Sequence, residues 1–151
     1  MPQHESLTTL LTNIPNPMSV TLTCKKQVDA KTVDQIDVSR NIRFFLNRLN
    51  QKLFGVRFTK HKTHMLKVVP VIEIDKQNRF HTHITLETPH QLTNEEFHHL
   101  IFDSWCKTRI GYRQFDIQKT YDIYGWTDYM LKRRTKVTNV FDSVDWENVN
   151  L

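Results

Sequence analysis

Apolar and polar residues along this chain repeat with two different periods. Strict alternation, as in Val20, Leu22 and Cys24 against Thr21 and Thr23, predicts half-buried strands. Recurrence every three to four residues predicts amphipathic helices. The strand period is found over residues 18–25, 65–75, 80–87 and 113–119, and the helix period over 35–54, 93–111 and about 124–134.

Local signals support these boundaries. Gly55 suits the end of the first helix, and Thr93 with Glu96 forms a capping box at the start of the second. Pro70 favours an edge position or a bulge for its strand. The order predicts an α+β fold with a ferredoxin-like or RRM-like βαββαβ antiparallel sheet, helices on one face, the other face free for a site, and a further C-terminal helix.

The predicted elements define one domain, residues 18–136. We expect an N-terminal arm over 1–17 and a loosely ordered acidic tail over 137–151. A length of 151 residues agrees with one core. The chain shows neither a signal-peptide pattern nor a run long enough to cross a membrane.

Composition narrows the classes of function. With three glycines the chain has neither a P-loop nor a dinucleotide fingerprint. Two distant cysteines argue against a disulfide framework or zinc ribbon and favour a reducing compartment, the cytoplasm, or the nucleus for a protein of a eukaryotic virus. A net charge of +5 mildly favours an anionic partner.

Candidate chemistry begins with His81 and His83, which point to the same side of their strand because they are two residues apart. If the hairpin turn is centred on Gln77, Glu73 lies directly opposite His81 on that face. Two imidazoles and a carboxylate can hold a metal ion such as iron, zinc or Mn²⁺. Asp75 is the alternative carboxylate, and a simple Glu–His ion pair is the structural alternative.

The last predicted helix carries the second candidate. Trp126 and Met130 can bury one face, which leaves Tyr129 and Lys132 as neighbours at i and i+3 on another. A nearby ammonium favours the phenolate form of tyrosine and can neutralise a phosphate. A surface tyrosine beside a solvated lysine would show the same pattern.

Three segments together resemble a known family. VTLTCK at 20–25, His81-Thr82-His83 with Glu73 upstream, and YMLK at 129–132 occur in the order found in HUH endonucleases of the rolling-circle replication initiator (Rep) type. The resemblance covers residues 18–134, nearly the whole predicted domain. Thr82 departs from it, because the family usually has a bulky hydrophobic residue between the histidines.

The resemblance implies a metal-dependent enzyme that nicks and rejoins single-stranded DNA at a replication origin, where a hairpin is one possible form of the substrate. His81, His83 and Glu73 would bind Mg²⁺ or Mn²⁺. Tyr129 would attack the scissile phosphate, leaving a 5′-phosphotyrosine and a free 3′-OH that primes synthesis, with Lys132 steadying the phosphate. Cations near element ends are candidates for phosphate contacts: Lys25, Lys26, Arg113, Arg133 and Arg134.

Three alternatives remain open. A single-tyrosine HUH transposase has the same chemistry, although Lys132 favours the replication initiator. An RRM-like binding module without catalysis would need aromatic residues on the central strands, where this chain has Thr21 and His83. A metal-dependent hydrolase would leave Tyr129 without a role. The sequence also leaves open the origin recognised, the oligomeric state and whether a host helicase is recruited.

Overall fold

The fold is described from a computed structural model of the full chain. The structure describes residues 2–132 and 142–151, with the side chains of residues 2, 3 and 132 excepted. The elements follow in the order α1 (Pro2–Leu11), β1 (Pro17–Cys24), β2 (Gln27–Val28), β3 (Lys31–Thr32), α2 (Gln35–Phe54), α3 (Val56–Thr59), β4 (Val68–Ile74), β5 (Phe80–Glu87), α4 (Asn94–Cys106), β6 (Gly111–Lys119), α5 (Ile123–Lys132) and the 3₁₀ turn η2 (Trp146–Asn148).

The protein is α+β, with a four-stranded antiparallel sheet in the order β4-β5-β1-β6. All four strands lie close to the positions that the alternating pattern predicts. β1 and β5 form the centre of the sheet, and β4 lies at its end, which is one of the two alternatives that Pro70 favours. This arrangement is consistent with a ferredoxin-like plan.

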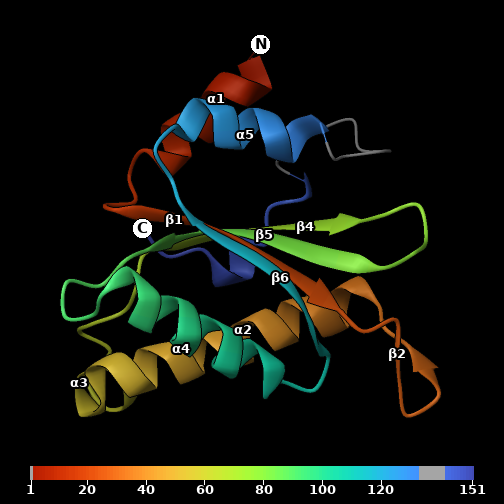
Figure 1. The fold of residues 1–151 in the computed structure, drawn as a ribbon, viewed down its shortest axis with the longest axis horizontal. Coiled ribbons are helices and arrows are strands. Elements are labelled where there is room, and N and C mark those ends of the chain that lie inside the picture. Colours follow the sequence, from red (N-terminus) through yellow and green to blue (C-terminus); the bar gives the residue numbers. More distant parts are fainter. Residues whose placement is uncertain (1, 133–141) are drawn as a thin grey trace.

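One face of the sheet packs on α2 and α4 (Figure 1). The inward residues of β1 and β5, such as Leu22 and Ile84, meet Phe45 of α2 and Trp105 of α4 in the main core. Both helices begin at capping boxes, of which the sequence predicted the one at Thr93. Asp34 and Asp37 form a capping box for α2, and the Thr93–Glu96 box opens α4.

The second helix ends earlier than predicted. α4 stops at Cys106, because the backbone N–H and hydroxyl of Thr108 both bond to the carbonyl of Trp105. Gly111 instead opens β6, where a Cβ atom would lie 2.0 Å from the Trp105 carbonyl oxygen. The glycine that suggested a helix end is therefore required by a close backbone approach.

The opposite face of the sheet is not free over its whole length, contrary to expectation. α5 lies over this face, and α1 packs against α5 (Figure 1). Leu7 and Leu11 of α1, Val71 of β4 and Met130 of α5 belong to a second core on this face. The expected N-terminal arm is thus largely a packed helix. The helix is so short that its apolar residues show too few repeats of the helical period to be recognised in the sequence.

The C-terminal residues also differ from expectation, because residues 142–151 are bound to the fold. Val68 exchanges hydrogen bonds with Asn150, and the N–H of Ile72 bonds to the carbonyl of Ser143. Pro70, which has no N–H to offer, lies between these two positions and accepts a bond from Asp145. Residues 143–150 therefore pair with the free edge of β4. Backbone hydrogen bonds fix their position, and no hydrophobic periodicity in the sequence could predict it.

No helix among residues 2–132 and 142–151 combines the length and apolarity that crossing a bilayer requires.

The packing of α1 can be tested by truncating one buried side chain. Leu7→Ala should lower the free energy of unfolding by about 2–5 kcal/mol, because Leu7 is fully buried in the second core. Ile36→Ala is the control, since Ile36 is 63% exposed. Urea denaturation checks both variants, and equal small effects would contradict the packing of α1 on α5.

Candidate functional site

The β4–β5 hairpin carries most of the candidate side chains, and Asp75 fixes its turn. The backbone N–H of Asp75 bonds to the carbonyl of Arg79, and its Oδ1 accepts the N–H groups of Gln77 and Arg79. Asn78 has a φ of 62°, a left-handed conformation that asparagine tolerates well. The turn is therefore specified by its own sequence.

The register of the hairpin is the one predicted. Glu73 pairs directly with His81, and Val71 pairs with His83. Ile72 and Val68 point into the main core from the other side of β4. The carboxylate and both imidazoles thus share the face of the sheet opposite α2 and α4.

The hydrogen bonds on this face join diagonal partners. The Nε2 atom of His83 lies 2.8 Å from Oε2 of Glu73, and Nε2 of His81 lies 2.8 Å from Oδ2 of Asp75. The structure therefore forms two His–carboxylate pairs. Side-chain ion pairs of this kind are the structural alternative that the sequence left open.

The other ring nitrogens are held by β1. The Nδ1 atom of His83 lies 3.1 Å from Oγ1 of Thr21, and Nδ1 of His81 lies 3.2 Å from Oγ1 of Thr23. β1 pairs with β5 so that each threonine stands beside its histidine. Each imidazole is fixed at one nitrogen by a hydroxyl and presents the other to a carboxylate, an arrangement typical of histidines that bind metals or transfer protons.

α5 places Tyr129 beside this set. The ring of Tyr129 stacks on that of Trp126 at 5.6 Å and stands edge-on to His83, with centroids 5.9 Å apart. Trp126 donates its indole N–H to Thr85 of β5, and Met130 is buried in the second core. The predicted inward pair Trp126 and Met130 therefore anchors the helix and brings the phenol to the histidines.

The two histidines, their threonine and carboxylate partners, and Tyr129 line one cavity of about 560 Å³. Among the described residues, its wall holds three carboxylates, those of Glu73, Asp75 and Asp116, and one lysine, Lys76. A phosphate entering such a cavity would be repelled unless a cation accompanied it. The lining residues are Thr21, Thr23, Glu73, Asp75, Lys76, Gln77, His81, His83, Gln114, Phe115, Asp116 and Tyr129.

The donor set suits a divalent cation in its chemistry, since imidazole nitrogens and carboxylate oxygens bind Mn²⁺ and its neighbours. Within the described part of the chain, however, no three His, Cys, Asp or Glu side chains are gathered closely enough to hold one ion. The His83–Glu73 and His81–Asp75 pairs would have to rearrange to share a metal.

The two carboxylates differ in how firmly they are held. Burial raises the pKa of Asp75, but hydrogen bonds from His81 and from the N–H groups of Arg79 and Gln77 outweigh it, and the pKa lies below its ordinary value. Asp75 is thus committed to the turn. The described hydrogen bonds of Glu73 join its side chain to His83 alone, which leaves it better able to turn toward a ligand.

Neither cysteine is suited to nucleophilic chemistry. Burial raises the pKa of the Cys24 thiol to about 12, despite the opposing charge of Arg79. Burial also raises the pKa of Cys106. Both thiols stay protonated near neutral pH.

Of the predicted phosphate contacts, the described residues Lys25, Lys26 and Arg113 do not line this cavity. Lys25 and Lys26 follow β1 and are exposed, and Arg113 lies on β6. Lys25 and Arg113 both act on the thiol of Cys106, which places them toward α4. Lys132 ends α5 but its side chain is outside the described residues, as are Arg133 and Arg134.

Sequence reasoning missed Lys76, Gln114 and Asp116 as cavity residues, and it assigned no role to Thr21 and Thr23. The alternation over 18–25 does place both threonines on the outward face. Their bonds to the histidines depend on the pairing of β1 with β5, the two central strands of the predicted plan, and on side-chain rotamers that the sequence does not specify.

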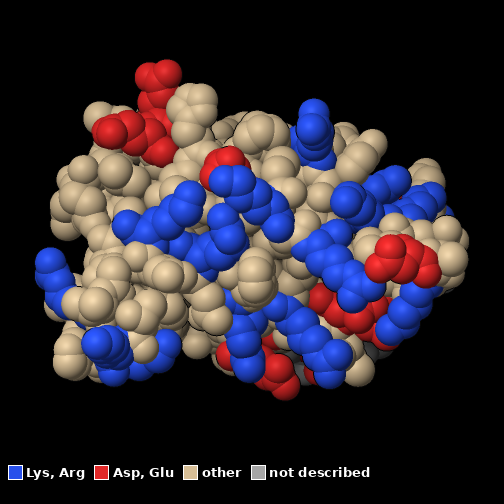
Figure 2. Space-filling model, turned by 90° about the horizontal axis from the view of Figure 1, so that it is seen from below, with Lys and Arg blue, Asp and Glu red and all other residues tan. Residues whose placement is uncertain are grey.

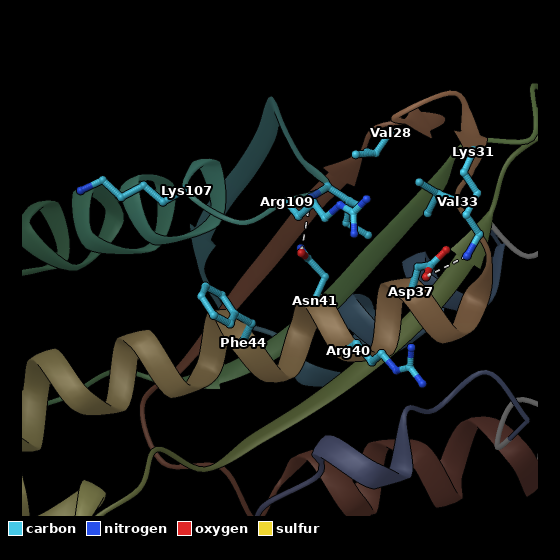
Figure 3. Close-up of a pocket in the computed structure, with 10 residues that line it drawn as sticks. Val28, Lys31, Val33, Asp37, Arg40, Asn41, Phe44, Lys107 and Arg109 are labelled. Atoms are coloured by element: carbon cyan, nitrogen blue, oxygen red, sulfur yellow. Dashed lines mark hydrogen bonds and ion pairs between the residues drawn. The ribbon is translucent and has the colours of Figure 1, made fainter.

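A second cavity, of about 490 Å³, opens on the other side of the sheet between α2, the β2–β3 hairpin and residues 107–110. Arg40 and Lys107 point away from the central Arg109 (Figure 3). Lys31 pairs with Asp37, and Lys107 and Arg109 also pair with carboxylates. Its charges do not converge on one point.

The helical face as a whole carries many lysine and arginine side chains, with carboxylates among them (Figure 2). Arg40, Arg43 and Arg48 form a basic stripe along α2. Within it, Arg43 contacts Glu147 and Asn148 of the C-terminal segment. Exposed pairs of this kind contribute little to stability or binding, and the stripe agrees with a solvated helix face.

Comparison of the chain with protein-family models, curated proteins and solved structures finds no significant match.

The Thr21–His83 and Thr23–His81 hydrogen bonds predict that each threonine affects one histidine selectively. Thr21→Val should change the ¹⁵N chemical shift of Nδ1 in His83 and leave that of His81 unchanged, because valine keeps the shape and removes the hydroxyl. Thr23→Val should do the reverse. NMR of the ring nitrogens checks this, with Thr21→Ser as the variant that retains the bond. Parallel shifts of both histidines in either variant would contradict the pairing.

Proposed function

We propose that this protein is an HUH-type endonuclease that nicks and rejoins single-stranded DNA, with Tyr129 as its nucleophile. One observation carries the proposal: the Tyr129 ring lies edge-on to His83 in the wall of the cavity that His81 and Glu73 also line. The phenol is thus next to groups able to bind a phosphate-associated cation.

The meeting of three distant segments supports this function. Residues 20–25, the hairpin 73–83 and the helix 123–132 are separate in the chain and supply neighbouring side chains here. The same segments carry the resemblance to the rolling-circle Rep proteins. The sheet order supports the ferredoxin-like plan expected for that class.

In the proposed reaction the oxygen of Tyr129 attacks the scissile phosphorus and loses its proton. The P–O3′ bond breaks, the 3′ oxygen takes up a proton, and the 5′ phosphate stays on the tyrosine. One phosphodiester replaces another, so the step is reversible and consumes no nucleotide. The free 3′-OH would serve as a primer, which fits initiation of rolling-circle replication at an origin.

His81, His83 and Glu73 are the residues that would hold Mn²⁺ or Mg²⁺. A bound divalent ion would supply the positive charge that the scissile phosphate needs in a wall of three carboxylates. Thr21 and Thr23 orient the imidazoles, and Asp75 keeps the turn and His81 in place. Lys132, one turn beyond Tyr129, is proposed to steady the phosphate.

The nucleophile can be identified by substituting tyrosines on the same helix. Tyr129→Phe should abolish the DNA-linked protein band, because phenylalanine has no attacking oxygen. Tyr124→Phe is the matched control, since Tyr124 is exposed on α5 and does not line the cavity. The assay uses labelled single-stranded oligonucleotides with randomised centres, Mn²⁺ or EDTA, and a denaturing gel.

Three outcomes separate the possible functions. A band that needs Mn²⁺, Tyr129 and His81 supports the nicking enzyme. Cleavage without a band that persists in Tyr129→Phe would replace it by a metal-dependent hydrolase. DNA binding that is unchanged by EDTA and by His81→Ala, with no cleavage, would favour a binding module without catalysis.

Glu73 and Asp75 should respond differently to substitution. Glu73→Gln should weaken Mn²⁺ binding about tenfold or more in calorimetric titration, since it removes one anionic ligand and no bond of the turn. Asp75→Ala should lower the free energy of unfolding by about 1–3 kcal/mol, because two N–H groups of the turn lose their acceptor. Weaker Mn²⁺ binding in Asp75→Ala than in Glu73→Gln would reverse the assignment.

A further inference from the structure

Exposed aromatic side chains are concentrated in one stretch of the chain. Of the large aromatic residues that are exposed in the described structure, those outside residues 112–129 are Phe44 and Trp146. Tyr121 is 88% exposed, and Lys119 lies 5.5 Å above its ring. An aromatic ring beside a cation is typical of surfaces that stack unpaired bases and contact the adjoining phosphates. The stretch contains Tyr112, Phe115, Tyr121, Tyr124 and Tyr129.

A further cavity of about 380 Å³ adjoins the candidate site and opens beside Tyr121. We call it the flanking cavity. Asp116 and Tyr129 line both this cavity and the cavity that contains the histidines, so Tyr129 stands between the two. The flanking cavity is lined by Ser19, Asp116, Gln118, Lys119, Thr120, Tyr121, Asp122, Gly125, Trp126 and Tyr129.

The polar groups of the flanking cavity are mainly acceptors. Gln118 uses its Nε2 on the carboxylate of Asp116, at 3.1 and 3.3 Å, which leaves its Oε1 for a ligand. The carboxylates of Asp116 and Asp122 add further acceptors. In the described lining of this cavity, the two carboxylates outnumber the one lysine, Lys119. This balance disfavours a phosphate inside the cavity and suits the donor edge of a base.

We propose that the flanking cavity receives the base next to the phosphate attacked by Tyr129, and that it selects a base with an exocyclic amino group. This inference rests on the proposed nicking function and adds a determinant of its sequence preference. Tyr121 supplies a stacking surface at the rim, and Lys119 contacts the neighbouring phosphate. Cytosine offers the amino group to Asp116 and Gln118, whereas thymine presents a carbonyl oxygen there.

The test compares two pyrimidine ligands that stack similarly. Fluorescence anisotropy measures binding of oligo(dC) and oligo(dT) of equal length at one salt concentration. The parent protein carries Tyr129→Phe, so that Mn²⁺ can be present without cleavage. Oligo(dC) should bind about fivefold or more tightly than oligo(dT). Asp116→Asn should bring this ratio close to one, because its amide can donate to the thymine carbonyl.

Stacking is tested separately from base selection. Tyr121→Ala should weaken binding of both oligonucleotides about fivefold or more, and Tyr121→Phe should bind like the parent. Phe44→Ala is the matched control, an exposed aromatic residue on α2 that is 53% exposed and lines the other cavity. Circular dichroism confirms that each variant is folded.

The outcomes distinguish this inference from the function on which it rests. Four outcomes would overturn the inferred base selection. They are equal binding of oligo(dC) and oligo(dT), a binding ratio unchanged by Asp116→Asn, equal effects of Tyr121→Ala and Phe44→Ala on binding, and no binding at all. Failure of the wild-type protein to form a covalent adduct with any oligonucleotide would overturn the nicking function. The binding ratios would still be readable in that case and would support a base-selective site without catalysis.

Discussion

The carboxylate of Asp75 fixes the register of the β4–β5 hairpin, and every feature of the candidate site depends on that register. Its Oδ1 closes the turn through the N–H groups of Gln77 and Arg79, and its Oδ2 holds His81. A slip of one residue would move Glu73 to the face that packs on α2 and α4. One local set of hydrogen bonds therefore decides which groups can meet in the cavity.

One face of the sheet forms the main core, and the opposite face carries both the candidate site and a second, smaller core. One face is covered by α2 and α4, which form the main core. On the other face a smaller core, which includes Leu7, Met130 and Val144, holds α5 in place. The N-terminal helix packs on α5 within that core, and the C-terminal segment contributes Val144 to it and also bonds to β4. By fixing α5 they fix the position of Tyr129 relative to His83.

The sequence predicted the parts of the fold that depend on local periodicity and capping. The bounds of α2 and β5, the capping box at Thr93 and the pairing of Glu73 with His81 are all as expected. The prediction was wrong where tertiary contacts decide. Helix α1 is short and gains its stability from α5, and residues 143–150 are placed by backbone bonds to β4.

The sequence predicted which residues share the face of the candidate site more fully than it predicted the contacts between them. The strand period places His81, His83 and Glu73 on one face, but it does not give side-chain rotamers. Side-chain rotamers decide the diagonal pairs His83–Glu73 and His81–Asp75. Strand order and rotamers together decide which threonine bonds to each histidine. The contact between Tyr129 and His83 depends on how α5 crosses the sheet, which no local pattern specifies.

The role of Tyr129 is tested most directly by locating the covalent bond. The protein would be incubated with Mn²⁺ and a cleavable single-stranded oligonucleotide, digested with protease and nuclease, and analysed by tandem mass spectrometry. A 5′-nucleotide attached to Tyr129, and to no other residue, is the predicted result. A nucleotide on another tyrosine, such as Tyr121 or Tyr124, or cleaved DNA with no modified peptide, would contradict it.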